Sequence, residues 1–163
     1  MPTSRLWREG IVTGLLGAGA VAAWFFVVDL LGGRPLYTPD MLGRALISVI
    51  GYTGIPPMWV SVVSYTAFHV AAFIAVGVVA ARLVEISRRA PHVTVGLLLF
   101  FVVFEVGFYL VALVAAQFEV VGNLAWYQIG AANLLAAGLM GSYLWRRHPE
   151  LKAEIKLALD GRV

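Results

Sequence analysis

Three strongly polar side chains lie near the middle of long apolar stretches: His69, Glu105 and Asn133. An ionisable group at the centre of a bilayer costs about 2.5–3.5 kcal/mol on insertion scales, so such groups usually have a partner or a function. An imidazole and a carboxyl group can pass protons, because the imidazole titrates near neutral pH. We expect His69 to be a proton acceptor or metal ligand, Glu105 its carboxylate partner, and Asn133 the residue that orients them.

Further polar side chains lie toward one end of the same apolar stretches. Two tyrosines each sit one helical turn from the ionisable residue of their own stretch, and so share its helix face. By contrast, residues 70–81 and 95–104 contain no polar side chain. The pattern predicts an outward-facing polar pocket, closed on the inner side, for a small ion, a proton or a ligand. The residues that join the pocket are Tyr65, Tyr109, Gln128 and Asp29.

The residue types limit the cofactors. An imidazole nitrogen and carboxylate oxygens can hold a single divalent metal, for which His69 and Glu105 are the candidate ligands. The chain has no cysteine, so iron–sulfur clusters and c-type haem are not expected. A second histidine at membrane depth is lacking, so bis-histidine haem is not expected either. We find no catalytic motif and therefore favour binding over catalysis, and we expect His148, in the tail, to be exposed.

Four apolar stretches are long enough to cross a membrane, since about 20 helical residues span its hydrocarbon core. The chain is 61% hydrophobic and only 13% charged, whereas soluble domains carry about 25% charged residues. The predicted fold class is therefore an all-α integral membrane protein, with residues 1–163 forming one domain built on a bundle of four transmembrane helices. The predicted spans are about 10–31, 57–84, 93–117 and 122–145.

Basic residues gather on alternate connections between these spans. Of the 12 Lys and Arg residues, two precede the first span, three lie at the second connection and five in the tail 146–163. By the positive-inside rule, both termini are cytoplasmic, and we expect a multi-pass protein of the cytoplasmic membrane of a prokaryote. The positive-inside rule accounts for where the basic residues lie, and the net charge is only +3. Nucleic acid is therefore not an expected partner.

The first outer loop contains a helix start. Thr38 is followed by Pro39 and Asp40, which predicts a hydroxyl cap, proline in the first turn and an acid near the positive helix end. The predicted helix, about 39–50, is amphipathic and lies on the outer membrane surface or caps the bundle, with Gly43 facing away from the apolar side. Arg34 is expected to pair with Asp29 or Asp40.

Small residues recur every four positions in the first span, at Gly10, Gly14, Ala18 and Ala22. Small side chains let helix backbones approach closely in a membrane. We favour packing within one bundle, and the alternative is a homo-oligomer or a larger membrane complex. A second interpretation of the function follows: a structural or accessory subunit, whose polar layer only fixes helix register.

Overall fold

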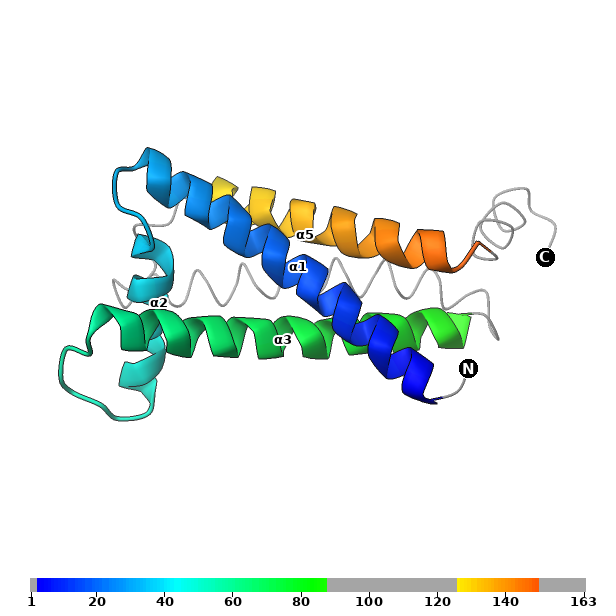
Figure 1. Cartoon of the computed structure of the whole chain (residues 1–163), viewed down its shortest axis with the longest axis horizontal. Helices are drawn as coiled ribbons and strands as arrows, with labels where there is room; N and C mark the ends of the chain where they lie inside the picture. Colours follow the sequence, from blue (N-terminus) through cyan, green and yellow to red (C-terminus); the bar gives the residue numbers. More distant parts are fainter. Residues whose placement is uncertain (1–2, 88–125, 150–163) are drawn as a thin grey trace.

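The structure is a computed structural model that describes residues 3–87 and 126–149. These residues form four helices and no strand: α1 (Thr3–Leu31), α2 (Tyr37–Val49), α3 (Met58–Ser87) and α5 (Trp126–Arg147) (Figure 1). The all-helical part of the predicted fold class is thus confirmed for the described residues. The predicted span 93–117, which carries Glu105 and Tyr109, lies outside them, as does most of the tail.

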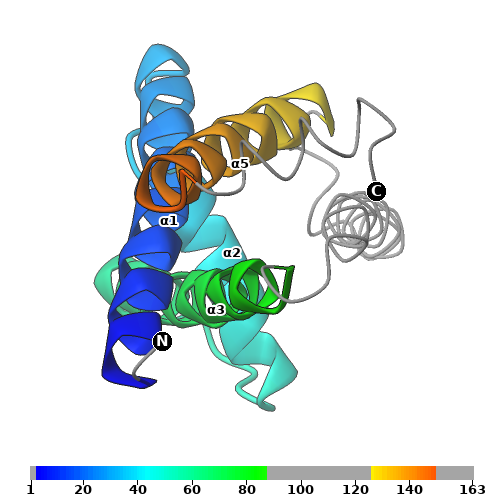
Figure 2. The same ribbon diagram turned by 90° about the vertical axis from the view of Figure 1, so that its right-hand side faces the viewer.

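Three long helices run along the molecule and the short α2 lies across one end of it (Figure 1). α1 packs against both α3 and α5, and α2 packs mainly on α3. α3 and α5 touch little, and their contact includes Val84 and Leu144. Figure 2 shows α1 on one side, next to both α3 and α5. The start of α1 and the end of α5 lie at the end opposite to α2.

Two of the described helices are long and apolar enough to cross a membrane, over residues Ser4–Leu31 and Met58–Ile86. Their apolar windows are only 28% and 17% buried inside the molecule. The central helices of a soluble protein bury most of their apolar surface, because water surrounds the fold. Here fewer than a third of the residues in each window are buried.

Glycines set the distance between α1 and α3. A Cβ atom added at Gly77 of α3 would collide with the backbone of Gly10 and Gly14. A Cβ at Gly10 would lie 2.6 Å from the Val78 Cα. Such backbone contact gives many van der Waals interactions, which drive helix association where the hydrophobic effect is absent. Gly10 and Gly14 thus pack within the chain, as the favoured interpretation has it, and an oligomer or larger complex stays a prediction.

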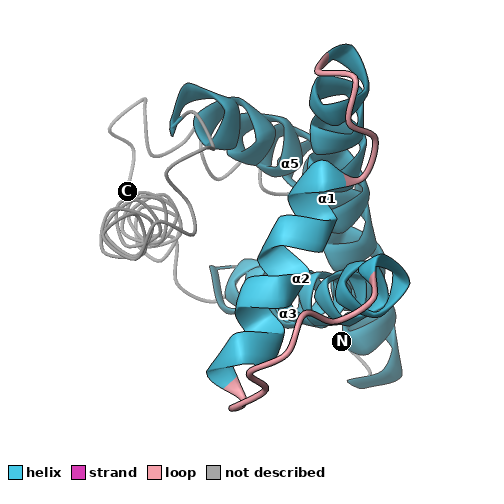
Figure 3. Cartoon of the chain, turned by 90° about the vertical axis from the view of Figure 1, so that its left-hand side faces the viewer, coloured by secondary structure: helices cyan, strands magenta, loops and turns pink. Residues whose placement is uncertain are grey.

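α2 differs from its predicted form. It begins at Tyr37, two residues before the predicted start, and its N-cap residue Leu36 has a left-handed backbone (φ 65°) with no side-chain cap. Gly43 does not face away but is buried on the backbone of Ser61 in α3, whereas Val49 of the expected buried face is 84% exposed. The close approach that only glycine permits outweighs the hydrophobic pattern. Figure 3 views the molecule from the end at which α2 lies, with α2 in front of α3.

Candidate ligand-binding site

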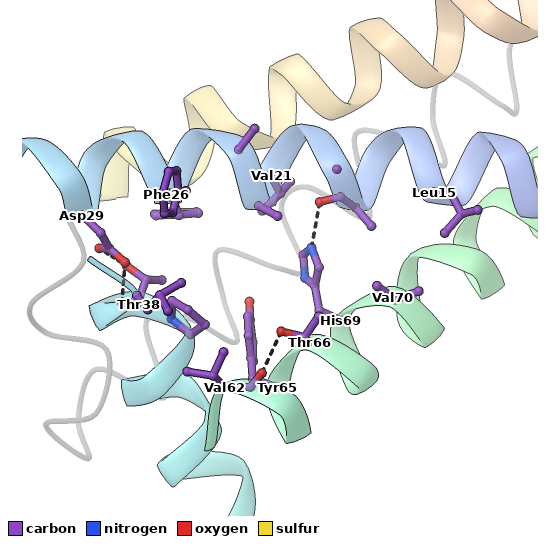
Figure 4. A pocket seen from close by; sticks show the side chains of 17 residues that line it. Leu15, Val21, Phe26, Asp29, Thr38, Val62, Tyr65, Thr66, His69 and Val70 are labelled. Carbon is purple, nitrogen blue, oxygen red and sulfur yellow. Dashed lines mark hydrogen bonds between the residues drawn. The ribbon is translucent and has the colours of Figure 1, made fainter. Parts of the chain in front are cut away.

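A cavity of about 550 Å³ lies between α1, the start of α2 and the N-terminal half of α3 (Figure 4). Its size is within the range of about 300–1,000 Å³ that small-molecule sites occupy. Among the described residues most of its lining is apolar, and polar groups come from one wall and one end. The larger apolar side chains are Leu15, Phe25, Phe26, Leu36, Val62 and Val70.

His69 stands in the wall formed by α3. Its Nε2 atom lies 3.3 Å from the carbonyl oxygen of Ala18 in α1. A carbonyl can only accept, so Nε2 carries the proton of this hydrogen bond and Nδ1 of the neutral ring is left as an acceptor. The ring is held between two aromatic neighbours, with centroids 5.5 Å from Tyr65 and 4.7 Å from Phe73. The predicted intramembrane histidine therefore also links α3 to α1.

Tyr65 lies one turn closer to α2 on the same face as His69, as the sequence predicts. Its ring rises from α3 toward α1, with the hydroxyl in the cavity (Figure 4). No other residue within 3–87 and 126–149 makes a hydrogen bond to this hydroxyl. A phenol in an apolar site normally has a partner, because an unmade hydrogen bond there is costly. The hydroxyl of Tyr65 is therefore free to donate to a molecule in the cavity.

Asp29 closes the end of the cavity beside α2. Its two carboxylate oxygens accept from the backbone N–H of Thr38 at 2.8 Å and from the Thr38 hydroxyl at 2.7 Å. The sequence predicted that Thr38 caps its own helix, and this prediction is wrong. Instead, Asp29 of α1 satisfies an N–H group in the first turn of α2, where negative charge is favoured. Asp29 lines the cavity, but both its oxygens are bound to Thr38 and hold α2 in place.

The expected pairing of Arg34 is wrong. Its guanidinium lies 4.1 Å from the ring centroid of Tyr37, a cation–π contact. Asp29 is bound by Thr38, and the carboxylate of Asp40 binds Arg44, with Nη2 2.9 Å from Oδ2. The reason is helical spacing: Asp40 and Arg44 lie one turn apart on α2, so their side chains meet without bending the loop.

Of the remaining predicted site residues, the two that the structure describes do not line this cavity. Asn133 and Gln128 are partly buried on α5, which packs against α1 and supplies none of the described lining. Glu105 and Tyr109 fall outside the described residues, so a layer of His69, Glu105 and Asn133 stays a prediction. The same holds for the metal: no group of three His, Asp or Glu side chains able to hold one occurs within the described ranges.

The sequence did not predict a second buried polar cluster, which lies at the end of the molecule opposite to α2. His148, expected to be exposed, is only 2% exposed and its Nε2 lies 3.1 Å from the Glu9 carboxylate. The Nε of Arg5 donates to the other Glu9 oxygen at 3.2 Å. A carboxylate four residues after an arginine was the available signal in the sequence. The burial of this cluster depends on α5 ending beside the start of α1. The sequence does not reveal this placement of the two helices.

The contact between Asp29 and Thr38 gives a prediction of moderate size. Asp29→Asn keeps one acceptor oxygen but turns an amide N–H₂ toward a donor of Thr38. We expect the free energy of unfolding to fall by about 1–2 kcal/mol, as for a buried charge-assisted hydrogen bond. Thermal unfolding in detergent measures it. Asp40→Asn is the control, because its ion pair is more exposed and should cost at most about 1 kcal/mol. Equal losses in both variants would contradict the role given to Asp29.

Comparisons with protein-family models, with curated proteins and with solved structures found no match to this chain. The described residues define an all-helical protein with two helices apolar enough to cross a membrane and a cavity between α1, α2 and α3. Its function must be inferred from the geometry and chemistry of that cavity.

Proposed function

We propose that this chain is an integral membrane protein with four spans and cytoplasmic termini, which binds an elongated amphiphilic molecule in the cavity between α1, α2 and α3. The outward-facing apolar surface of α1 and α3 supports the membrane location. The gathering of basic residues in the first turns of α1, from the end of α3 onward and from the end of α5 onward supports the orientation. α2 then lies at the outer surface, and the cavity lies in the outer half of the membrane.

The shape of the cavity favours a long ligand. From Leu15 to Asp29 the lining follows α1 for about 21 Å, at the rise of an α-helix. One leaflet of a bilayer contributes roughly 15 Å of hydrocarbon thickness. The polar groups lie at the α2 end and along the adjacent wall, and the opposite end is apolar. An amphiphile would therefore lie with its polar part near α2 and its apolar chain toward Leu15 and Val70.

The observation that carries the proposal is the unpartnered hydroxyl of Tyr65 in an apolar cavity. It can donate a hydrogen bond to a carbonyl, ester or hydroxyl oxygen of the ligand. Nδ1 of His69, one turn deeper, can accept a bond from a ligand hydroxyl. These two groups fix the position of one oxygen-bearing part of the ligand, while the apolar lining holds the chain.

Among the predicted cargoes, the cavity favours a ligand over an ion. An ion in a membrane needs charges or several carbonyl oxygens that replace its hydration shell. The Asp29 carboxylate is bound to Thr38, and the Nε2 atom of His69 is bound to Ala18. The other described side chains of the lining are apolar apart from Tyr65, Thr38 and Thr66. The Thr66 hydroxyl donates to the Val62 carbonyl at 2.7 Å and is also engaged.

Tyr65→Phe tests this function because it removes the hydroxyl and keeps the ring. Purified in mild detergent, the unaltered protein should carry an amphiphile that is detected by native mass spectrometry. We expect Tyr65→Phe to weaken its binding about fivefold, the equivalent of about 1 kcal/mol for one hydrogen bond. Ala22→Phe, which fills the cavity from α1, should remove the bound molecule.

The matched control is Tyr52→Phe, since Tyr52 is 52% exposed in the loop between α2 and α3. It should leave ligand content unchanged. An accessory subunit that binds nothing in this cavity would give the same mass spectrum for all four proteins, with no bound amphiphile. That outcome would reject the proposed function.

A further inference from the structure

A second hollow lies on α3 beside the ligand cavity. It has a volume of about 490 Å³, and its described lining comes from α3 alone. We call it the α3 groove. Apart from residues that it shares with the cavity, it is lined by Val63, Ala67, Ala71 and Ile74. Val63 is 60% exposed, and both alanines are exposed as well, so the groove opens on the outward-facing surface of α3.

The groove and the cavity share three residues, Val62, Thr66 and Val70 (Figure 4). They are spaced four apart, so their side chains form one stripe along α3. All three are β-branched and stiff. The hydroxyl of Thr66 is satisfied by the Val62 carbonyl, which leaves the stripe a low apolar ridge between two parallel hollows. We call it the α3 ridge.

We propose that the two hollows hold the two hydrocarbon chains of one glycerophospholipid, with one chain on each side of the α3 ridge. This inference rests on the proposed function, because the cavity must first accept an apolar chain. Both hollows are apolar and of similar volume, and both begin at Val62, one residue from the point where α2 packs on Ser61. Two chains joined at one glycerol need such a common starting level.

The α2 end supplies a partner for the rest of this lipid. The Tyr65 hydroxyl, one turn inside the level of Ser61, suits an ester carbonyl where a chain joins the glycerol. Arg34 lies in the turn that brings Leu36 to the cavity and stacks on Tyr37. Its guanidinium can bind phosphate oxygens, whose geometry it matches well. Asp29 and Asp40, the nearest acids in sequence, are held by Thr38 and Arg44.

The test compares a lipid with two chains and its one-chain derivative. Dioleoylphosphatidylglycerol and oleoyl-lysophosphatidylglycerol are each titrated into the full-length, delipidated protein and followed by native mass spectrometry. We expect the two-chain lipid to bind at least about tenfold more tightly, the equivalent of about 1.4 kcal/mol. Ala71→Phe fills only the α3 groove, and it should reduce this preference to roughly unity while binding of the one-chain lipid persists.

Val79→Phe is the matched control, because Val79 is exposed on α3 two turns beyond Ala71 and lines neither hollow. It should keep the preference. If Ala71→Phe does not fold, as judged by thermal unfolding, Ala67→Leu replaces it. Equal binding of both lipids by the unaltered protein, or a preference that survives filling of the groove, would overturn this inference and leave the proposed function intact. Binding of neither lipid, with an empty cavity after mild purification, would reject both.

Discussion

Gly77→Val is expected to prevent the native packing of α1 on α3. The added side chain would have to occupy the space of the Gly10 and Gly14 backbones, and backbone atoms cannot turn aside as a flexible side chain can. Overpacking of a well-packed contact costs about 1–3 kcal/mol and sometimes more. Because here the obstacle is backbone and the new side chain is branched, we expect at least about 3 kcal/mol. The folded fraction in size-exclusion chromatography and the midpoint of thermal unfolding measure this loss.

Gly138→Val and Gly77→Ala complete the experiment. A Cβ at Gly138 of α5 meets nothing within 4 Å, so its substitution should change stability by well under 1 kcal/mol. Gly77→Ala introduces only the colliding Cβ and should fall between the two. If Gly77→Val and Gly138→Val unfold at the same temperature, the close contact of α1 with α3 is not what holds the helices together.

The sequence predicts well those features that depend on local pattern. Length and hydropathy locate α1 and α3, because a membrane-crossing helix must be apolar along its whole length. The spacing of Gly10 and Gly14 marks the face of α1 that packs, since small residues in register allow close approach. The turn residues before and after α2 locate this helix to within two residues at its start. Each prediction needs only the periodicity of one segment.

The sequence fails where a side chain takes its partner from another helix. Thr38 has the pattern of a local cap, but Asp29, nine residues earlier, competes for its hydroxyl and its N–H with a full negative charge. His148 follows two arginines and resembles an exposed residue, but α5 ends beside Glu9 of α1. These pairings depend on the relative placement of helices, which hydrophobic periodicity does not encode.

Only part of the candidate site could be predicted from the sequence. His69 and Tyr65 share a helix face, and Asp29 lies near the C-terminal end of α1, so periodicity predicts that all three lie toward the same end of the molecule. The apolar character of the cavity was not predicted, because it arises where Phe25 and Phe26 of α1 line the same space as apolar side chains of α3. In an apolar sequence, a polar residue can be recognised as a candidate binding residue. An aromatic residue in such a sequence cannot be told apart from one that only contacts lipid.

Glu9→Ala is expected to lower stability by about 1–3 kcal/mol, the usual cost of removing one partner of a buried hydrogen bond. The substitution leaves the imidazole of His148, which is 2% exposed, without the carboxylate that its Nε2 contacts at 3.1 Å. It also removes the carboxylate bound by Arg5. Since Glu9 lies at the start of α1 and His148 just after α5, the loss should free these two helix ends from each other. Thermal unfolding measures the stability, and a spin-label pair at Trp7 and Trp145 measures the separation.

The double substitution distinguishes a specific pair from a general need for polar groups at this position. Replacing both partners of a buried hydrogen bond by apolar residues of similar shape can be nearly neutral or stabilising, because no desolvated polar group is then left without its partner. Glu9→Leu with His148→Leu should therefore recover most of the stability that Glu9→Ala loses. Arg5→Gln is the control for the exposed side of the cluster, since Arg5 is 55% exposed and should contribute at most about 1 kcal/mol. If the loss of stability in the double variant equals the sum of the losses in Glu9→Leu alone and His148→Leu alone, the two residues act independently, and the contact between them does not hold the end of α5 against the start of α1.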